Sequence, residues 1–138
     1  MSQLFTFIGN HPFLVGLFVL LIALFVRNEV KRGGKTVTSQ ELVNLINRDS
    51  AVVVDIRDSK EYFEGHVPKA LNIPFTALQT RVKELEKYKE SPVVVTCKAG
   101  QHSSMAGTIL RKAGFQNVAK LRGGLLEWRN DNMPVEKG

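Results

Sequence analysis

Only one cysteine occurs in the 138-residue chain, and its surroundings are those of a reactive thiol. Cys97 follows a β-branched run at residues 92–96 and precedes a glycine-containing polar loop that ends before Ser103. A helix starting near Ser103 points its free N–H groups into this loop, and such a loop stabilises a thiolate and holds an anionic substrate. The alternative is a small buried residue at the end of a strand. The polar loop and the helix start favour a nucleophile.

The residues around Cys97 and the cysteine count narrow the chemistry further. Lys98 and a protonated His102 add positive charge to the loop and favour the thiolate. A single cysteine excludes an internal disulfide framework and a cysteine-rich zinc site.

Short apolar runs alternate with helix patterns along residues 36–138. A capping-box pattern from Thr38 to Glu41 predicts one helix start, and Gly114 marks the end of another helix. Buried strands are predicted at residues 51–54, 71–73, 92–96 and 118–121, and helices begin near residues 39, 58, 78, 103 and 124. This alternation predicts an α/β domain, a parallel sheet with helices on both faces. Ligands bind at the carboxyl ends of such strands, where Cys97 stands.

Three ordered motifs in the same segment resemble the signatures of the rhodanese (sulfurtransferase) family. They are Val54-Asp55-Ile56-Arg57 with Gly65-His66-Val67-Pro68, the loop Cys97-Lys98-Ala99-Gly100-Gln101-His102-Ser103, and Arg122-Gly123-Gly124 with Trp128. The resemblance covers residues 36–138 and implies a rhodanese-like fold. It also implies that Cys97 is the sulfur-carrying nucleophile. The substrate-binding residues that it implies are Lys98, Ala99, Gly100, Gln101, His102 and Ser103.

The reaction that the resemblance implies has two halves. In the first, the Cys97 thiolate takes the outer sulfur of a donor such as thiosulfate, and a persulfide forms on Cys97. In the second, a thiol or cyanide acceptor removes that sulfur from the persulfide. The chain has no second cysteine, so the acceptor comes from outside. The reaction requires no metal and no organic cofactor.

Two loop positions bear on the choice of substrate. The family commonly has arginine, an always charged bidentate anchor, where this sequence has His102, and a histidine offers only one or two donors. Efficient use of thiosulfate is therefore an open question: either the donor is different, or the loop amides suffice. Phosphatases of related folds use a Cys-x5-Arg loop, which would need arginine at the position of Ser103. Phosphate chemistry is therefore not expected.

Other residues of the motifs are expected to serve the fold. Aspartate at a strand end commonly caps or pairs, so we assign Asp55 and Arg57 a structural role. His66 lies in a turn motif and has no partners at metal-ligand spacing. Trp128 is expected to pack in the core or at an interface.

The first 30 residues predict a membrane anchor. Residues 13–26 lack polar side chains, and as a helix they span about 21 Å, short of the roughly 30 Å hydrocarbon core. If the helix extends back to Leu4, it is long enough to span the core. Pro12, however, suits the first turn of a helix. A helix that starts there would leave residues 4–8 in the membrane interface. A signal peptide needs basic residues before the apolar run, and the first is Arg27. A helix buried in a protein core is the other alternative, but it would need other parts of the chain to cover it on all sides.

Positive charge is concentrated next to this anchor. Residues 27–35 contribute four Lys/Arg and one Glu to the net charge of +6. The positive-inside rule places the N-terminus outside and residues 27–138 in the cytoplasm, as a single-pass protein of the inner (cytoplasmic) membrane. The predicted parts are a transmembrane anchor at 1–30, a basic glycine-containing linker at 31–35 and a rhodanese-like domain at 36–138. The remainder is mildly basic without interleaved aromatics, so no nucleic-acid partner is expected.

Two functions from different classes fit these observations. The first is a membrane-tethered sulfurtransferase whose partners are a sulfur donor, a thiol acceptor and the lipid bilayer. The second is a non-catalytic or weakly catalytic rhodanese-fold interaction module docked on an integral membrane protein complex. His102, the basic run, and Gly16 with Ala23 on one helix face favour the second function. Cys97 and its intact loop favour the first.

Overall fold

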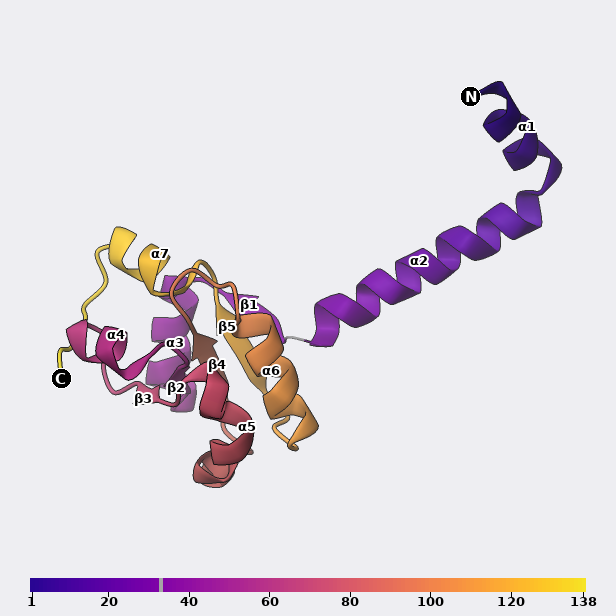
Figure 1. Cartoon of the computed structure of the whole chain (residues 1–138). Coiled ribbons are helices and arrows are strands. Elements are labelled where there is room, and N and C mark those ends of the chain that lie inside the picture. The colour runs from indigo at the N-terminus through magenta and orange to yellow at the C-terminus, as the bar shows by residue number, and fades with distance from the viewer. Residues whose placement is uncertain (33) are drawn as a thin grey trace. The chain divides into compact units, whose positions relative to one another are not determined.

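The computed structural model describes residues 1–32 and 34–138 (Figure 1). The chain divides into two compact units, Met1–Lys31 and Arg32–Gly138. Gly33, part of the predicted linker 31–35, lies outside the described residues.

The second unit is built on a five-stranded parallel sheet (Figure 1). Its strands are β1 (Lys35–Val37), β2 (Val52–Asp55), β3 (Leu71–Asn72), β4 (Val93–Thr96) and β5 (Val118–Leu121), in the order β1-β5-β4-β2-β3. All neighbouring strands run parallel, and β4 pairs with β5 on one side and β2 on the other. The predicted parallel α/β sheet is therefore confirmed, and the strand that leads to Cys97 is the central one.

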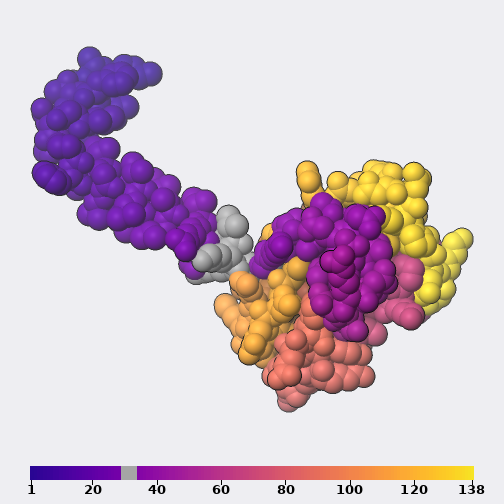
Figure 2. Space-filling model, turned by 180° about the vertical axis from the view of Figure 1, so that it is seen from behind, coloured from indigo at the N-terminus to yellow at the C-terminus, as the bar shows by residue number. Residues whose placement is uncertain are grey.

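Helices cover both faces of the sheet, as predicted. One face carries α3 (Ser39–Asp49), α4 (Ser59–Glu64) and α7 (Gly124–Asn130), and the other carries η1 (Phe75–Ala77), α5 (Leu78–Arg81), η2 (Val82–Tyr88) and α6 (Ser103–Lys112). Side chains alternate along β4, so Val93 and Val95 face one core and Val94 the other. Trp128 is buried beside α3. Figure 2 shows the face that α3 covers, with α7 and the C-terminal residues next to it.

The start of α3 has the Thr38 side-chain cap that the capping-box pattern of the sequence predicts. Thr38 Oγ1 accepts a hydrogen bond from the Glu41 N–H at 3.2 Å, and the Thr38 carbonyl oxygen accepts one from the Leu42 N–H at 2.9 Å. Leu42 is fully buried in the core beneath α3. The cap therefore fixes where this helix meets the sheet.

Two short elements differ from the sequence expectations. Lys35, assigned to the linker 31–35, begins β1, in which Val37 pairs with Leu121 of β5. A three-residue strand is too short to show a period in the sequence. The helix expected up to Tyr88 is divided after Arg81, where an α-helical turn gives way to the tighter 3-10 helix η2.

The N-terminal part contains two helices, α1 (Ser2–Asn10) and α2 (Pro12–Arg32). α2 begins at Pro12, as predicted, because proline lacks the N–H that a helix interior needs. The two helix axes are bent by 97° at this break. The single spanning helix expected from the sequence is therefore unconfirmed. Among the described residues, no single helix is long and apolar enough to cross a bilayer. Ser2–Asn10 and Pro12–Asn28 meet the requirements of length and apolar character only as a pair.

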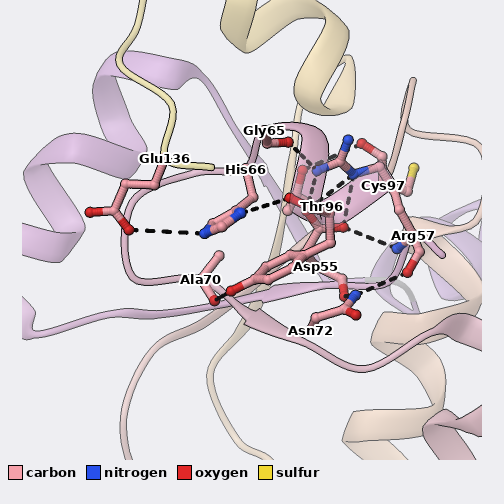
Figure 3. Close-up of polar contacts among 10 residues, drawn as sticks. Asp55, Arg57, Gly65, His66, Ala70, Asn72, Thr96, Cys97 and Glu136 are labelled. Atoms are coloured by element: carbon pink, nitrogen blue, oxygen red, sulfur yellow. Dashed lines mark hydrogen bonds and ion pairs between the residues drawn. The ribbon is translucent and has the colours of Figure 1, made fainter. Parts of the chain in front are cut away.

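Residues 131–138 form a C-terminal strap that ties α4 to α7 (Figure 3). His66 and Glu136 exchange backbone hydrogen bonds of 2.9 and 2.8 Å, and the Glu136 carboxylate lies 3.9 Å from His66 Nε2. Trp128 Nε1 donates to the Pro134 carbonyl oxygen at 2.8 Å. The His66 ring stacks on Tyr62, with ring centroids 3.7 Å apart. These contacts hold α4 and its following turn in place.

The partial burial of Tyr62 predicts a pH dependence of stability. Burial raises the pKa of Tyr62, and the negative charges of Asp55 and Glu136 act in the same direction. Because the raised pKa belongs to the folded state, this contribution to stability is intact below about pH 10 and is lost as pH rises from there through the folded pKa. Tyr62→Phe should abolish this alkaline loss. It should also cost about 1 kcal/mol at neutral pH, since the hydroxyl donates to the Ala70 carbonyl oxygen.

Urea unfolding of the parent and Tyr62→Phe proteins at about pH 7 and about pH 11 measures both effects. Equal losses of stability in the two proteins between these pH values would show that Tyr62 does not cause the alkaline destabilisation.

Candidate active site

Cys97 lies at the carboxyl end of β4, with 4% of the residue exposed. Its Sγ accepts a hydrogen bond from the Gly100 N–H at 2.8 Å and another from the Ser103 hydroxyl at 3.3 Å. Gly100 has a φ of +89°, a left-handed conformation that favours glycine and lets the loop turn back towards the sulfur. Ser103 is fully buried in the first turn of α6. The loop thus provides the donors that stabilise a thiolate.

The first turn of α7 packs directly against this loop. The Leu125 N–H donates to the Cys97 carbonyl oxygen at 2.9 Å, and the Leu126 N–H donates to the Lys98 carbonyl oxygen at 3.0 Å. Gly124 has a φ of +60°, and a Cβ at this position would collide with the Cys97 carbonyl oxygen. The second glycine of the third motif therefore has a physical reason: Gly124 allows two backbones to approach closely enough to bond.

A buried ion pair lies at the end of the neighbouring strand β2 (Figure 3). Arg57 Nη2 is 2.7 Å from Asp55 Oδ2 and donates to the Gly65 carbonyl oxygen, also at 2.7 Å. Asp55 is fully buried and also accepts from the Arg57 N–H at 3.0 Å. The Asn72 side-chain amide donates to the carbonyl oxygens of both residues. The pair fixes the end of β2, in agreement with the structural role expected from the sequence.

Cys97 lines a cavity of about 270 Å³. The cavity walls are formed by Ile56, Arg57, Asp58, Glu61, Phe75, Thr76, Cys97, Lys98, Gln101 and His102. Of the predicted site residues, Lys98, Gln101 and His102 thus join Cys97 at the cavity. Gly100 and Ser103 contact the sulfur instead, and Ala99 neither lines the cavity nor bonds to the sulfur.

The cavity has an aromatic wall that the sequence did not reveal. The His102 ring stacks on Phe75, with centroids 5.0 Å apart and planes inclined by 18°. Phe75 reaches the site because β3 lies next to β2, and the Phe75 N–H donates to the Ile56 carbonyl oxygen at 2.9 Å. One local feature of the sequence could have indicated Phe75 as a site residue: it directly follows Pro74, which ends a predicted strand. Strand order, which brings it to Cys97, was the missing information.

Within residues 1–32 and 34–138, no group of three or more His, Cys, Asp or Glu side chains is placed to hold a metal ion. His66 is engaged by the fold: its Nδ1 lies 2.8 Å from the Tyr62 carbonyl oxygen.

The fold and the loop geometry agree with a known protein family. The family described as Rhodanese-like domain matches residues 38–131. Because this match covers most of the chain, the protein belongs to the rhodanese-like domain family. The resemblance seen in the three sequence motifs is confirmed to this extent.

Similar proteins include members named for sulfur transfer. The uncharacterized protein YibN of Escherichia coli strain K12 is 34% identical over 142 residues, which cover 100% of this chain and 99% of YibN. A sulfurtransferase of Allochromatium vinosum is 32% identical over 91 residues, covering 66% of this chain and 83% of that protein. The solved structure of thiosulfate sulfurtransferase from Pseudomonas aeruginosa has a TM-score of 0.70 at 29% identity, covering 80% of this chain and 21% of that one.

The support of the loop by α7 predicts an unequal cost of two glycine substitutions. Gly124→Ala should cost about 1–3 kcal/mol of stability beyond the cost of Gly114→Ala, because its Cβ displaces the Cys97 loop. Gly114 is the matched control: its φ is also positive, at +102°, but an added Cβ meets only the Lys89 side chain, at 3.6 Å. Urea unfolding measures the difference. Equal costs would contradict a close backbone approach at Gly124.

Proposed function

We propose that this protein is a sulfurtransferase in which Cys97 carries sulfane sulfur as a persulfide. The observation that carries the proposal is the pair of donors on the Cys97 sulfur, the Gly100 N–H and the Ser103 hydroxyl, beside a cavity that Cys97 lines. Sulfur transfer needs a thiolate that is stabilised and can be reached by a substrate. The relatives named for sulfur transfer support the same reaction.

In the first half-reaction, the Cys97 thiolate attacks the outer sulfur of a donor such as thiosulfate. A new S–S bond forms on Cys97 while the S–S bond of the donor breaks, and sulfite leaves with the bonding electron pair. The loop donors stabilise the negative charge on the attacking thiolate and then on the persulfide, as an oxyanion hole does. Lys98 contributes a positively charged side chain to the cavity wall, which attracts an anionic donor.

In the second half-reaction, an acceptor thiolate or cyanide attacks the outer sulfur of the persulfide. The Cys97 thiolate is the leaving group, so the enzyme returns to its starting state and the kinetics are ping-pong. Cys97 is the only cysteine of the chain, so a thiol acceptor belongs to another molecule.

The hydrogen bond from Ser103 gives a direct test of the loop donors. Ser103→Ala removes one hydrogen bond to a charged sulfur and should lower the rate of sulfur transfer about tenfold. Ser104→Ala is the matched control, because Ser104 is exposed and its hydroxyl accepts from Lys120 Nζ at 2.6 Å. Thiocyanate formed from thiosulfate and cyanide is the readout, and Cys97→Ser supplies the background. Equal rates for the two alanine variants would remove Ser103 from the mechanism.

His102 is the position at which the chain departs from the family's usual arginine. His102→Arg should raise kcat/KM for thiosulfate about tenfold, because arginine presents an always charged bidentate fork to an anion. Arginine also retains a flat group that stacks on Phe75. His102→Gln is uncharged at every pH and serves as the control for charge. If His102→Arg leaves kcat/KM unchanged, the loop N–H groups bind the donor without help from this side chain.

We also propose that the N-terminal helices tether the domain to the inner membrane, with the domain in the cytoplasm. Most large hydrophobic side chains between residues 4 and 26 are exposed, and apolar surface of this extent requires lipid or protein to cover it. Four basic residues follow within residues 27–35, which supports the orientation.

The interaction module remains the alternative function, with an integral membrane protein complex as its partner. It is supported by Gly16, where an added Cβ would meet nothing within 4 Å, leaving room for another helix to approach. Replacement of residues 4–26 by an unrelated apolar helix should preserve membrane attachment and sulfur transfer but abolish capture of a specific membrane partner. Carbonate extraction of membranes, the thiocyanate assay and chemical crosslinking measure the three properties. A chain that stays soluble in the cell would contradict the tether.

A further inference from the structure

The charges of the domain are distributed unevenly along its sequence. No Asp or Glu occurs between Glu90 and Glu127, the stretch that forms β4, the Cys97 loop, α6, β5 and the turn before α7. The basic residues of this stretch are Lys98, Arg111, Lys112, Lys120 and Arg122. The rest of residues 36–138 holds more acidic than basic side chains, so the positive charge of the domain comes from this stretch.

The fold gathers most of these basic side chains at one edge of the sheet, on α6, β5 and β1 (Figure 1). β1 is the edge strand, and its Lys35 pairs with Ala119 of β5. α6 packs on β5, where Lys120 Nζ donates to the Ser104 hydroxyl of α6 at 2.6 Å. Arg122 directly follows β5 and is exposed, as Lys35 is. We call the surface formed by Lys35, Lys112, Lys120, Arg122 and the exposed side of α6 the basic face.

The exposed side of α6 adds an apolar side chain to the basic face. Met105 and Lys112 are two helical turns apart, so they project from the same side of α6. Met105 is 58% exposed, and Lys112 is exposed as well. Basic side chains beside an exposed apolar one suit the surface of a bilayer, where the bases meet phosphate groups and the apolar side chain reaches the acyl boundary.

The chain enters the domain at the basic face. Gly34 and Lys35 run along β5, so closely that a Cβ on Gly34 would collide with the Val118 carbonyl oxygen. Residues 27–35 separate the apolar segment from this point, and nine residues reach at most about 30 Å. A bilayer that holds the apolar segment therefore keeps the basic face close to its headgroups, at a high effective concentration.

We propose that the basic face docks on the anionic headgroups of the cytoplasmic leaflet. This inference rests on the proposed membrane tether and gives the tethered domain an orientation. No residue of the basic face lines the cavity of Cys97, whose walls come from the β2, β3 and β4 side of the sheet, so docking leaves that cavity open. A nucleic acid fits the face less well, because α6, β5 and β1 contain no aromatic residue on which bases stack.

Fluorescent labels at two matched positions test the inference on the full chain in vesicles. Met105→Cys and Phe63→Cys are each made in the Cys97→Ser chain, so that every protein has a single thiol. The two positions are equally exposed, at 58% and 57%, but Phe63 lies on α4, on the opposite face of the sheet from α6. A quencher attached to lipid headgroups shows which label lies at the membrane surface.

In vesicles of phosphatidylcholine with phosphatidylglycerol, the label at Met105 should be quenched more strongly than the label at Phe63. In vesicles of phosphatidylcholine alone, the two labels should be quenched alike. Salt at about 1 M should remove the difference, because it shortens the Debye length to about 3 Å. Lys112→Gln with Lys120→Gln should lower the ratio of docked to undocked domain about 30-fold, since each base at an anionic surface contributes about fivefold.

Lys112→Gln alone, at an exposed position, should lower the same ratio about fivefold without disturbing the fold. Lys60→Gln with Lys83→Gln is the matched control, since both lysines are exposed, lie outside the basic face and give the same change of charge as the double variant. This control should keep the parent ratio.

Equal quenching of the two labels in vesicles with phosphatidylglycerol would overturn the inference, and so would a difference that the Lys112 and Lys120 variants leave intact. In either case, a chain that floats with both kinds of vesicle keeps the proposed tether. A chain that floats with neither kind contradicts the tether, and the docking of the basic face fails with it.

Discussion

The close approach of α7 to the loop after β4 is the constraint on which the candidate site depends. Two backbone hydrogen bonds from the first turn of α7 hold the Cys97 and Lys98 carbonyls, and only a glycine at Gly124 leaves room for them. With these carbonyls held by α7, the loop places the Gly100 N–H and the Ser103 hydroxyl on the sulfur. These donors are in position before a substrate arrives, so their electrostatic stabilisation costs no reorganisation during the reaction.

The remaining elements bring three strand ends and two helices to this loop. β4 leads to Cys97, β2 ends in the Asp55–Arg57 pair, and Phe75 follows β3, so the strand order β4-β2-β3 decides which side chains share the cavity. The C-terminal strap ties α4 in place through its hydrogen bonds with His66. Because Glu61 of α4 lines the cavity at Cys97, the strap also supports one wall of that cavity.

Local patterns in the sequence predicted much of this fold. Buried β-branched runs predicted β2 and β4, and the segment from Val118 to Leu121 was also predicted as a strand. The capping-box pattern at Thr38 predicted the start of α3, and Pro12 predicted the start of α2. Strand order and helix packing involve residues distant in sequence, so Phe75 was not a candidate and Arg57 was assigned only to the fold. The loop from Cys97 was found because its composition departs from that of the strand before it. The 97° bend between α1 and α2 was not predicted, since composition sets apolar length but not direction.

The proposed mechanism depends on one claim, that Cys97 carries the transferred sulfur. Intact-mass spectrometry of the full chain after incubation with sulfane-sulfur donors, beside the Cys97→Ser variant, tests that claim most directly. We expect a gain of one sulfur atom, about 32 Da, that cyanide removes and that Cys97→Ser does not show. An unchanged mass with thiosulfate and with a persulfide donor, or an equal gain in Cys97→Ser, would contradict it.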